Sequence, residues 1–219
     1  MTDSSSPQPA FIQGEVVDAV DVPGSLRMIT LSGRFVTLRR PELADAGPLF
    51  RATHGEADRE RVWAYLGYGP WPGFDEFRGW VEERVSSIDP QWFTVTSNET
   101  GSPVGMVTIL NADLPNRRLE LGHIWYIPPA QRTAANTEAT YLLLNESFDY
   151  YRSRRVEWKC DANNAKSRQS ALRLGFTFEG IFRNHMIVKG RNRDTAWFSI
   201  TDAEWPAVKG KLEDRLYPG

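Results

Sequence analysis

Residues 125–138 read WYIPPAQRTAANTE and join the end of an apolar segment, a loop of small and polar residues, and the start of a helical pattern. The first turn of a helix leaves backbone N–H groups unpaired and carries partial positive charge, so such a turn can bind pyrophosphate without a ligating side chain. Arg132 adds a full positive charge here. Many strand–loop–helix turns look alike and are capped by Asn or Thr, so the pattern alone leaves phosphate binding and a purely structural turn open.

Apolar periodicity on both sides of this loop predicts alternating strands and helices. Strands are expected at residues 35–39, 92–96, 104–110, 119–127, 155–160, 176–188 and 194–200. Helices are expected at residues 42–54, 137–151, 165–174 and 202–216, with two short helices around a rigid aromatic loop between Arg59 and Val85. The helix between the strands at 119–127 and 155–160 makes a βαβ crossover, so these two strands are expected to be parallel.

These elements predict a single α/β domain over residues 31–219, with a mixed central sheet of about six to seven strands and flanking helices. Residues 1–30 mix Ser, Pro, Gln and Gly without a sustained period, and we expect them to form a flexible or loosely docked extension. The 219 residues, 41% of them hydrophobic, are sufficient for a sizeable core. Fibrous and wholly disordered proteins are therefore excluded.

Charge and cysteine content indicate where such a protein works. The formal net charge is −2, so the chain as a whole does not attract DNA or an anionic membrane. No apolar run approaches the roughly 18 residues of a membrane span, and residues 1–7 lack the features of a secretory signal. The single cysteine, Cys160, suits a reducing compartment and is expected to serve packing. We therefore expect a cytoplasmic protein.

Positive charge is concentrated in the segment after the 125–138 loop. Residues 151–193 contain eleven Lys and Arg residues against three acidic ones, although the whole chain is slightly acidic. This distribution fits a small polyanionic cofactor. The alternatives are a solvated basic face or a patch that contacts ribosomal or other RNA, although few stacking aromatic residues accompany the charges.

Three further stretches carry a family resemblance: LELGHIW at residues 119–125, NAKS at 164–167 and LGF at 174–176. Together with QRTAAN at 131–136, they resemble the RimJ/RimL-type branch of the GNAT superfamily of N-acetyltransferases over residues 31–212. The resemblance implies the GNAT fold and transfer of an acetyl group from acetyl-CoA to a primary amine by direct attack. The acceptor would be a protein N-terminus, such as that of a ribosomal protein, or a small-molecule amine. The resemblance does not decide between a monomer and a homodimer.

The resemblance also implies where acetyl-CoA binds. The implied contacts are Trp125, Tyr126, Ile127, Gln131, Arg132, Thr133, Ala134, Ala135, Asn136, Thr137, Asn164 and Ser167. Ala134 and Asn136 stand where glycines are commoner in this loop. Ala134 adds only a methyl group, and Asn136 is expected to cap the helix or to adopt the left-handed conformation.

Two side chains are candidates for the chemistry that the resemblance implies. Glu120 matches the glutamate that removes a proton from the amine, and the alternative is an ion pair with Arg117, Arg118 or another cation. Ser167 would donate a hydrogen bond to the leaving thiolate, and the alternative is a bond within the start of a helix. Asn164 would bind the pantetheine amides or cap the helix. Backbone N–H groups at a bulge near residues 124–127 would hold the oxyanion.

Three residues are candidates for contact with the acceptor: Trp71, Phe74 and His123. Each has a structural alternative, because aromatic residues at helical spacing cover cores and a lone histidine is commonly a satisfied core residue. The three histidines show no metal-ligand spacing, so no metal is expected. The absent loop glycines, and Ala171 where many family members have Tyr, leave a non-catalytic coenzyme A or partner-binding module as the alternative function.

Overall fold

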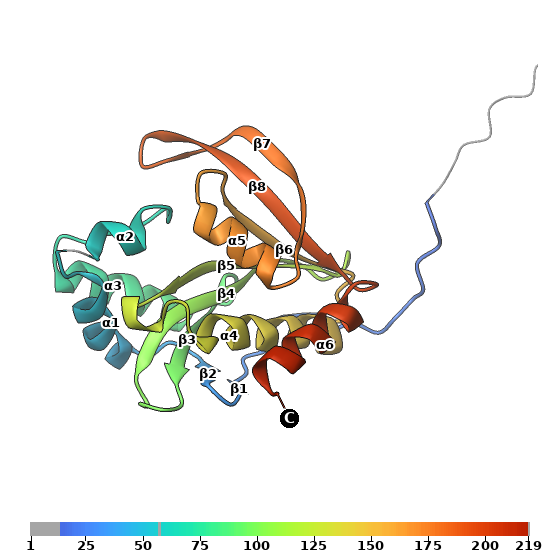
Figure 1. Ribbon diagram of the computed structural model, residues 1–219, viewed down its shortest axis with the longest axis horizontal. Helices are drawn as coiled ribbons and strands as arrows, with labels where there is room; N and C mark the ends of the chain where they lie inside the picture. Colours follow the sequence, from blue (N-terminus) through green and yellow to red (C-terminus); the bar gives the residue numbers. More distant parts are fainter. Residues whose placement is uncertain (1–13, 57, 219) are drawn as a thin grey trace, which may run out of the picture.

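Segments with period-two apolar patterns pair into one sheet of eight strands, in the order β1-β2-β3-β4-β5-β6-β8-β7 (Figure 1). The computed structural model describes residues 14–56 and 58–218. The strands are β1 (Leu31–Ser32), β2 (Val36–Arg39), β3 (Gln91–Ser97), β4 (Pro103–Asp113), β5 (Arg118–Tyr126), β6 (Arg155–Asp161), β7 (Thr177–Val188) and β8 (Arg191–Thr201). The helices are α1 (Ala46–Thr53), α2 (Arg59–Trp63), α3 (Phe74–Val85), α4 (Ala134–Asn145), α5 (Ala165–Arg173) and α6 (Trp205–Leu216).

The predicted fold class is confirmed. Strands β5 and β6 are parallel, as the crossover through α4 requires, and the other neighbouring pairs are antiparallel. The sheet has eight strands, slightly more than the expected six to seven. The additional strand is β1, and its two residues are too few to show any periodicity.

Alternate residues of the strands face two separate cores. On one face, Val107, Leu119 and Val156 pack in a cluster with residues of α4 such as Leu143. On the other face, aromatic residues of α2, α3 and the strands form a second cluster. We call this second group the aromatic cluster: Ala46, Leu49, Trp63, Phe77, Trp80, Val81, Trp92, Met106 and Trp125, with partly buried Phe50, Val62, Leu66, Tyr68, Trp71 and Ile127 against them. Among the described residues, every helix is too short or too polar to cross a bilayer.

Two predicted helices differ in detail. The segment expected at 42–54 begins with a short 3-10 turn, Leu43–Asp45, because the Glu42 and Asp45 side chains form a capping box there. The helix expected from 137 starts at Ala134, and its last turn, Glu146–Tyr150, is a π-helix. The first 13 residues of the extension predicted over residues 1–30 lie outside the described part of the chain. Just before that division, Leu26 and Ile29 pack against the first core.

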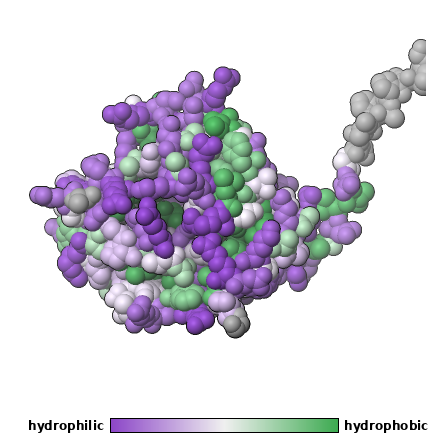
Figure 2. Space-filling view, in the orientation of Figure 1, coloured by the Kyte–Doolittle hydropathy of each residue, from purple (hydrophilic) through white to green (hydrophobic). Residues whose placement is uncertain are grey.

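Strand β7 is an edge of the sheet and is exposed along most of its length. Its large apolar side chains at the surface are Phe178, Ile181, Phe182, Met186 and Ile187. Figure 2, in the same orientation as Figure 1, shows hydrophobic residues gathered at the place where Figure 1 draws β7. The tip of the β7–β8 hairpin contacts α2, where Lys189 Nζ donates a hydrogen bond of 2.8 Å to the Trp63 carbonyl.

Glu138 of α4 ties together both ends of the described domain. Its buried carboxylate accepts hydrogen bonds from the backbone N–H groups of Arg34, Phe35 and Val36, at 2.8, 2.6 and 2.7 Å. The Tyr217 hydroxyl, beyond α6, donates to the same carboxylate at 2.9 Å. Charged acceptors make stronger hydrogen bonds than neutral ones. The carboxylate therefore fixes the start of β2 and the C-terminal residues against α4.

Replacing Glu138 by Ala is expected to lower the free energy of unfolding by about 3 kcal/mol or more, because three backbone N–H groups lose their acceptor. Denaturant unfolding followed by tryptophan fluorescence measures this change. Tyr217→Phe is the matched control, since it removes one hydrogen bond and should cost about 1 kcal/mol. Equal losses in the two variants would show that the backbone N–H groups do not carry the effect.

Candidate active site

Strands β5 and β6 separate part-way along their length. They pair only from Arg118↔Arg155 to Leu121↔Trp158, although β5 continues to Tyr126 and β6 to Asp161. Residues 122–126 and 159–161 therefore have no strand partner across the resulting gap. Backbone N–H and C=O groups need hydrogen-bond partners. The facing edges of this gap can accept an extended, amide-bearing ligand in place of a strand.

A β-bulge in β5 lies at the side of this gap. Pairing with β4 shifts between Thr108↔Gly122 and Met106↔Trp125, and His123 has a φ of 50° in the left-handed region. The bulge thus lies at residues 123–124 and shares only Ile124 with the range expected for it, 124–127. Bulges leave a residue unpaired and turn the chain, which frees N–H groups of β5 from the ladder. These groups can hold an oxyanion.

Glu120 lies on β5 two residues before the gap region, and only 5% of it is exposed. Its Oε2 atom is 2.5 Å from Lys159 Nζ and accepts a hydrogen bond of 2.6 Å from Asn111 Nδ2. Burial raises the pKa of the Glu120 carboxyl, while Lys159 and Asn111 oppose that rise. The structure therefore holds the Glu120 carboxyl group in a buried position with the Lys159 cation beside it.

The partner of Glu120 differs from the arginines considered on sequence. Arg118 instead contacts Asp113 and Glu157, each at 3.4 Å. The sequence did not identify Lys159, because this residue lies on a different strand, β6. Glu157 of β6 is paired with Glu120, and Lys159 is two residues further along β6, on the same face of the sheet. Alternation along β6 would have placed Lys159 on the face of Glu120, but only if the register between the strands were known.

The loop after β5 leads into the N-terminus of α4. Gln131 Nε2 donates to the Tyr126 carbonyl at 3.1 Å, which joins the loop to the end of β5. Thr133 caps the helix by accepting from the Ala135 N–H at 3.2 Å, and Arg132 takes the left-handed conformation with a φ of 65°. The first turn of α4 therefore follows the open end of β5.

The role expected for Asn136 is wrong on both counts. Asn136 neither caps α4 nor adopts a positive φ, because the helix starts two residues earlier and Thr133 and Arg132 take those roles. Instead, Asn136 Nδ2 donates to Ser170 Oγ of α5 at 3.0 Å. Its Oδ1 atom is buried without a partner among the described residues. Asn136 thus ties α4 to α5 and retains a free hydrogen-bond acceptor.

Helix α5 begins directly after β6, on the opposite side of the gap from α4. Asn164 caps α5 by accepting from the Ser167 N–H at 3.1 Å. The Ser167 hydroxyl accepts a hydrogen bond of 3.0 Å from the Trp158 indole, and it also contacts the Cys160 thiol, whose pKa it acts to lower against the larger effect of burial. Cys160 belongs to the first core, and burial there raises the pKa of its thiol. Both observations support the expected packing role of Cys160.

The residues expected to contact the acceptor lie in or beside the aromatic cluster. His123 packs against the rings of Tyr68 and Trp92, at centroid distances of 5.5 and 4.8 Å. Trp71 is 4.8 Å from Trp80, while Phe74 is 41% exposed at the rim of the cluster. Burial, with smaller effects of Arg84 and Arg193, lowers the pKa of His123 to about 4. His123 is therefore a neutral imidazole at physiological pH.

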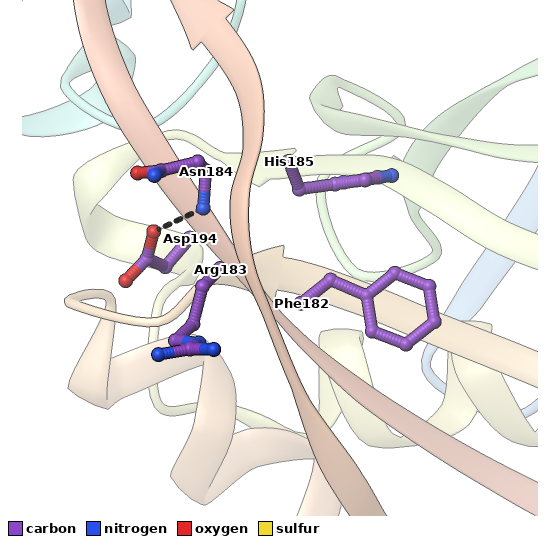
Figure 3. Close-up of a pocket in the computed structure, with 5 residues that line it drawn as sticks. All are labelled: Phe182, Arg183, Asn184, His185 and Asp194. Carbon is purple, nitrogen blue, oxygen red and sulfur yellow. Dashed lines mark hydrogen bonds between the residues drawn. The ribbon is translucent and has the colours of Figure 1, made fainter.

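A surface hollow of about 760 Å³ lies outside the gap, on the β7–β8 hairpin (Figure 3). Its lining residues are Phe182, Arg183, Asn184, His185 and Asp194. In Figure 3, Phe182 and His185 lie on one side of the strand, and Arg183, Asn184 and Asp194 lie on the other. None of the predicted site residues lines this hollow. The candidate site is therefore the gap between β5 and β6 and not this hollow.

Comparisons with known proteins show the family to which the chain belongs. The profile of the family described as "Acetyltransferase (GNAT) domain" matches residues 36–177. The chain belongs to the GNAT family. It is an N-acyltransferase of the GNAT type, as the sequence predicts, and its assignment to the RimJ/RimL-type branch is confirmed.

Several GNAT proteins are similar to this chain over most of its length. The "Putative ribosomal N-acetyltransferase YdaF" of Bacillus subtilis (strain 168) is 31% identical over 80% of this chain and 95% of its own. The "Uncharacterized N-acetyltransferase p20" of Bacillus licheniformis is 28% identical over 81% of this chain and 99% of its own. The crystal structure of a GCN5-related N-acetyltransferase from Brucella melitensis is 38% identical, covers 90% of each chain and has a TM-score of 0.85.

The burial of His123 gives a testable titration. Its pKa of about 4 lies below the value of about 6.5 expected in the unfolded chain, so the unfolded chain binds a proton at higher pH. The corresponding stability is present above about pH 6.5 and is lost as the pH falls towards about 4. NMR of the imidazole protons should give the low pKa, and His123→Gln should flatten the dependence of stability on pH. Titration near the ordinary value would contradict the observed burial.

Proposed function

We propose that this GNAT chain transfers an acetyl group from acetyl-CoA to a primary amine in the gap between β5 and β6. The observation that carries the proposal is the coincidence of three features at one place. Strand pairing stops after Leu121 and Trp158, the bulge at His123 frees backbone donors, and the buried carboxylate of Glu120 lies beside the gap. The single buried cysteine and the use of acetyl-CoA support a cytoplasmic location.

The residues around the gap fit acetyl-CoA. The first turn of α4 supplies unpaired N–H groups for a pyrophosphate, and Arg132 supplies a positive charge. The unpaired backbone of residues 122–126 suits the amides of a pantetheine arm, and Asn136 Oδ1 is a buried acceptor without a partner among the described residues. The proposed binding residues remain Trp125, Tyr126, Ile127, Gln131, Arg132, Thr133, Ala134, Ala135, Asn136, Thr137, Asn164 and Ser167. When bound, acetyl-CoA supplies the acetyl group as a thioester.

Each catalytic task has a residue suited to it. An amine must lose a proton to act as a nucleophile, and the Glu120 carboxylate is the base that accepts it, directly or through water. Backbone N–H groups freed by the bulge hold the oxyanion of the tetrahedral intermediate. The Ser167 hydroxyl, whose oxygen already accepts from Trp158, donates its proton in a hydrogen bond to the leaving thiolate. The acceptor enters beside Trp71, Phe74 and His123.

Lys159 favours the ionised form of the Glu120 carboxyl group. A buried carboxyl group without a nearby cation tends to stay protonated, and a protonated Glu120 could not accept a proton. The Lys159 ammonium, 2.5 Å from Oε2, favours the ionised form. Lys159 is therefore a positioning residue that acts through Glu120 and keeps the base active near neutral pH.

Two acceptor classes are included in this proposal, a protein N-terminus and a small-molecule amine. The Bacillus subtilis relative carries the word "ribosomal" in its name. A structure of the microcin C7 self-immunity acetyltransferase MccE, in complex with acetyl-CoA and AMP, has a TM-score of 0.66 but is only 24% identical, so that likeness concerns the fold alone. A screen of peptide and small-molecule amines with acetyl-CoA distinguishes the two classes.

Acetyl-CoA at 100 times its dissociation constant should stabilise the folded chain by about 2.7 kcal/mol, which raises the thermal midpoint by about 5 to 10 °C. Adenosine alone should have no such effect. Ala134→Asp should abolish the rise, because it places a negative charge at the first turn of α4 where the pyrophosphate is expected. No rise with acetyl-CoA in the unsubstituted chain would overturn the binding site.

Glu120→Gln should lower kcat by about 100-fold or more, because glutamine cannot accept the proton. The thermal rise with acetyl-CoA should be unchanged. Glu179→Gln is the matched control, since Glu179 is a half-exposed carboxylate of the same sheet, and it should retain normal turnover. Full turnover in the Glu120 variant would remove Glu120 as the base.

Lys159→Met should move the acidic limb of the kcat/KM profile to higher pH by about one unit or more, because the Glu120 pKa rises when its cation is removed. Lys159→Arg keeps the charge and should restore most of the original profile. A lower rate with an unshifted profile in the methionine variant would assign Lys159 a purely structural role.

A further inference from the structure

Three aromatic rings lie together on the β7–β8 hairpin. The ring centroids of Phe182 and Trp197 are 4.8 Å apart, and the His185 ring lies 5.5 Å from the first and 6.0 Å from the second. A contact of 2.9 Å between His185 Nδ1 and Thr195 Oγ1 holds the imidazole in place. We call Phe182, His185 and Trp197 the hairpin platform. Phe182 is 53% exposed and His185 is also exposed, so the hairpin platform is open to solvent.

The hairpin platform lies on the same face of the sheet as Glu120. Strand register pairs Glu120 with Glu157 of β6, and it pairs Lys159, two residues further along β6, with Trp197 of β8. The Lys159 ammonium contacts both groups, because its Nζ atom is 2.5 Å from Glu120 Oε2 and 4.3 Å from the centroid of the Trp197 ring. The carboxylate and the ring are therefore no further apart than the sum of these two distances.

A hollow of about 270 Å³ connects the hairpin platform with the neighbourhood of Glu120. Its lining residues are Arg155, Glu157, Glu179, Gly180, Phe182 and Trp197. The charged members compensate one another, since Arg155 forms ion pairs with both Glu157 and Glu179. A Cβ atom at Gly180 would meet nothing within 4 Å, so the space beside the rings is open. In Figure 3, Phe182 lies on the same side of its strand as His185. The free contacts that this hollow offers are therefore aromatic rings.

Helices cover only part of this sheet face. Buried residues of α4, α5 and α6 belong to the first core on the other face, whereas those of α1, α2 and α3 belong to the aromatic cluster. The strand residues of the aromatic cluster come from β3, β4 and β5, so the described helices leave this face open over β6, β8 and β7. The Lys189–Trp63 hydrogen bond brings the hairpin tip to the aromatic cluster. In strand order, Glu120 thus lies between the aromatic cluster and the hairpin platform.

We propose that the hairpin platform binds an aromatic ring of the acceptor, so that the enzyme prefers primary amines that carry such a ring a few bonds from the nitrogen. This inference rests on the proposed function and adds the class of acceptor. Aromatic rings pack with their centroids about 4.5 to 7 Å apart. A ring on Phe182 and Trp197 therefore leaves the amine within reach of Glu120. An arylalkylamine and a peptide with an aromatic N-terminal residue share this chemistry.

The first test compares acceptors that differ only in the ring. Phenethylamine should have kcat/KM about 3- to 10-fold above 2-cyclohexylethylamine, because the two amines have similar apolar size but only the first has an aromatic face. The dipeptide amides Phe-Ser-amide and cyclohexylalanyl-Ser-amide are compared in the same way. A preference for the aromatic member of either pair supports the proposal, and the pair that reacts faster identifies a small-molecule or a peptide acceptor. Equal rates within both pairs overturn the proposal.

The second test changes the hairpin platform. Phe182→Leu should lower kcat/KM for phenethylamine by about 3- to 10-fold and leave that for 2-cyclohexylethylamine nearly unchanged, because leucine keeps an apolar surface but has no ring. Phe182→Tyr keeps the ring and should retain the preference. Phe178→Leu is the matched control, since Phe178 is 43% exposed on the same strand but packs against Phe198 of the first core, on the opposite face. Equal losses for both amines in Phe182→Leu would overturn ring recognition.

The third test needs no turnover. 2-Phenylethanol carries the ring but no amine, and saturation-transfer NMR should detect its binding to the unsubstituted chain and to Phe178→Leu, with a clearly weaker signal for Phe182→Leu. The thermal rise with acetyl-CoA should persist in Phe182→Leu, and its loss would place Phe182 in the donor site and overturn the proposal.

The outcomes separate this proposal from the proposed function. If 2-phenylethanol binds as expected while no amine is acetylated, the ring site on the hairpin platform stands and the proposed reaction fails. If amines are acetylated without any preference for a ring, the reaction stands and the ring site fails.

Discussion

The separation of β5 from β6 is the constraint on which the site depends. Parallel strands normally continue their ladder, but here pairing ends at Leu121↔Trp158 while both strands run on. The bulge at His123 bends β5 at this point and keeps its far side paired with β4 up to Tyr126↔Gly105. The free edges therefore belong to strands that are rigidly held on their other sides. A ligand can replace the missing ladder without disturbing the core.

Helices α4 and α5 follow from the same separation. Each begins where its preceding strand ends, so both N-termini lie at the open end of the gap, and the Asn136–Ser170 hydrogen bond holds the two helices together. Glu138, two residues further along α4, fixes the other side of that helix through the start of β2 and Tyr217. The position of the first turn of α4 is thus set by contacts with α5, with the start of β2 and with the residue that follows α6.

The charged and neutral groups of β5 beside the gap differ in their electrostatic surroundings. Glu120 is buried but has Lys159 beside it, so its carboxylate can stay ionised within the sheet. His123 is kept neutral by its burial beside Tyr68 and Trp92. A buried carboxylate and a neutral imidazole thus lie on the same strand, on either side of the point where β5 leaves β6.

The sequence by itself determined the order of strands and helices, the one parallel pair, the bulge in β5 and the family, because apolar periodicity and the motifs between residues 119 and 176 are local signals. It also identified Glu120 as the candidate base. Only the tertiary structure revealed Lys159 and Asn111 beside that carboxylate and the bond from Asn136 to Ser170. These contacts join residues from different elements, and their formation depends on strand register and helix start, which shift by one or two residues without any visible change in the sequence pattern.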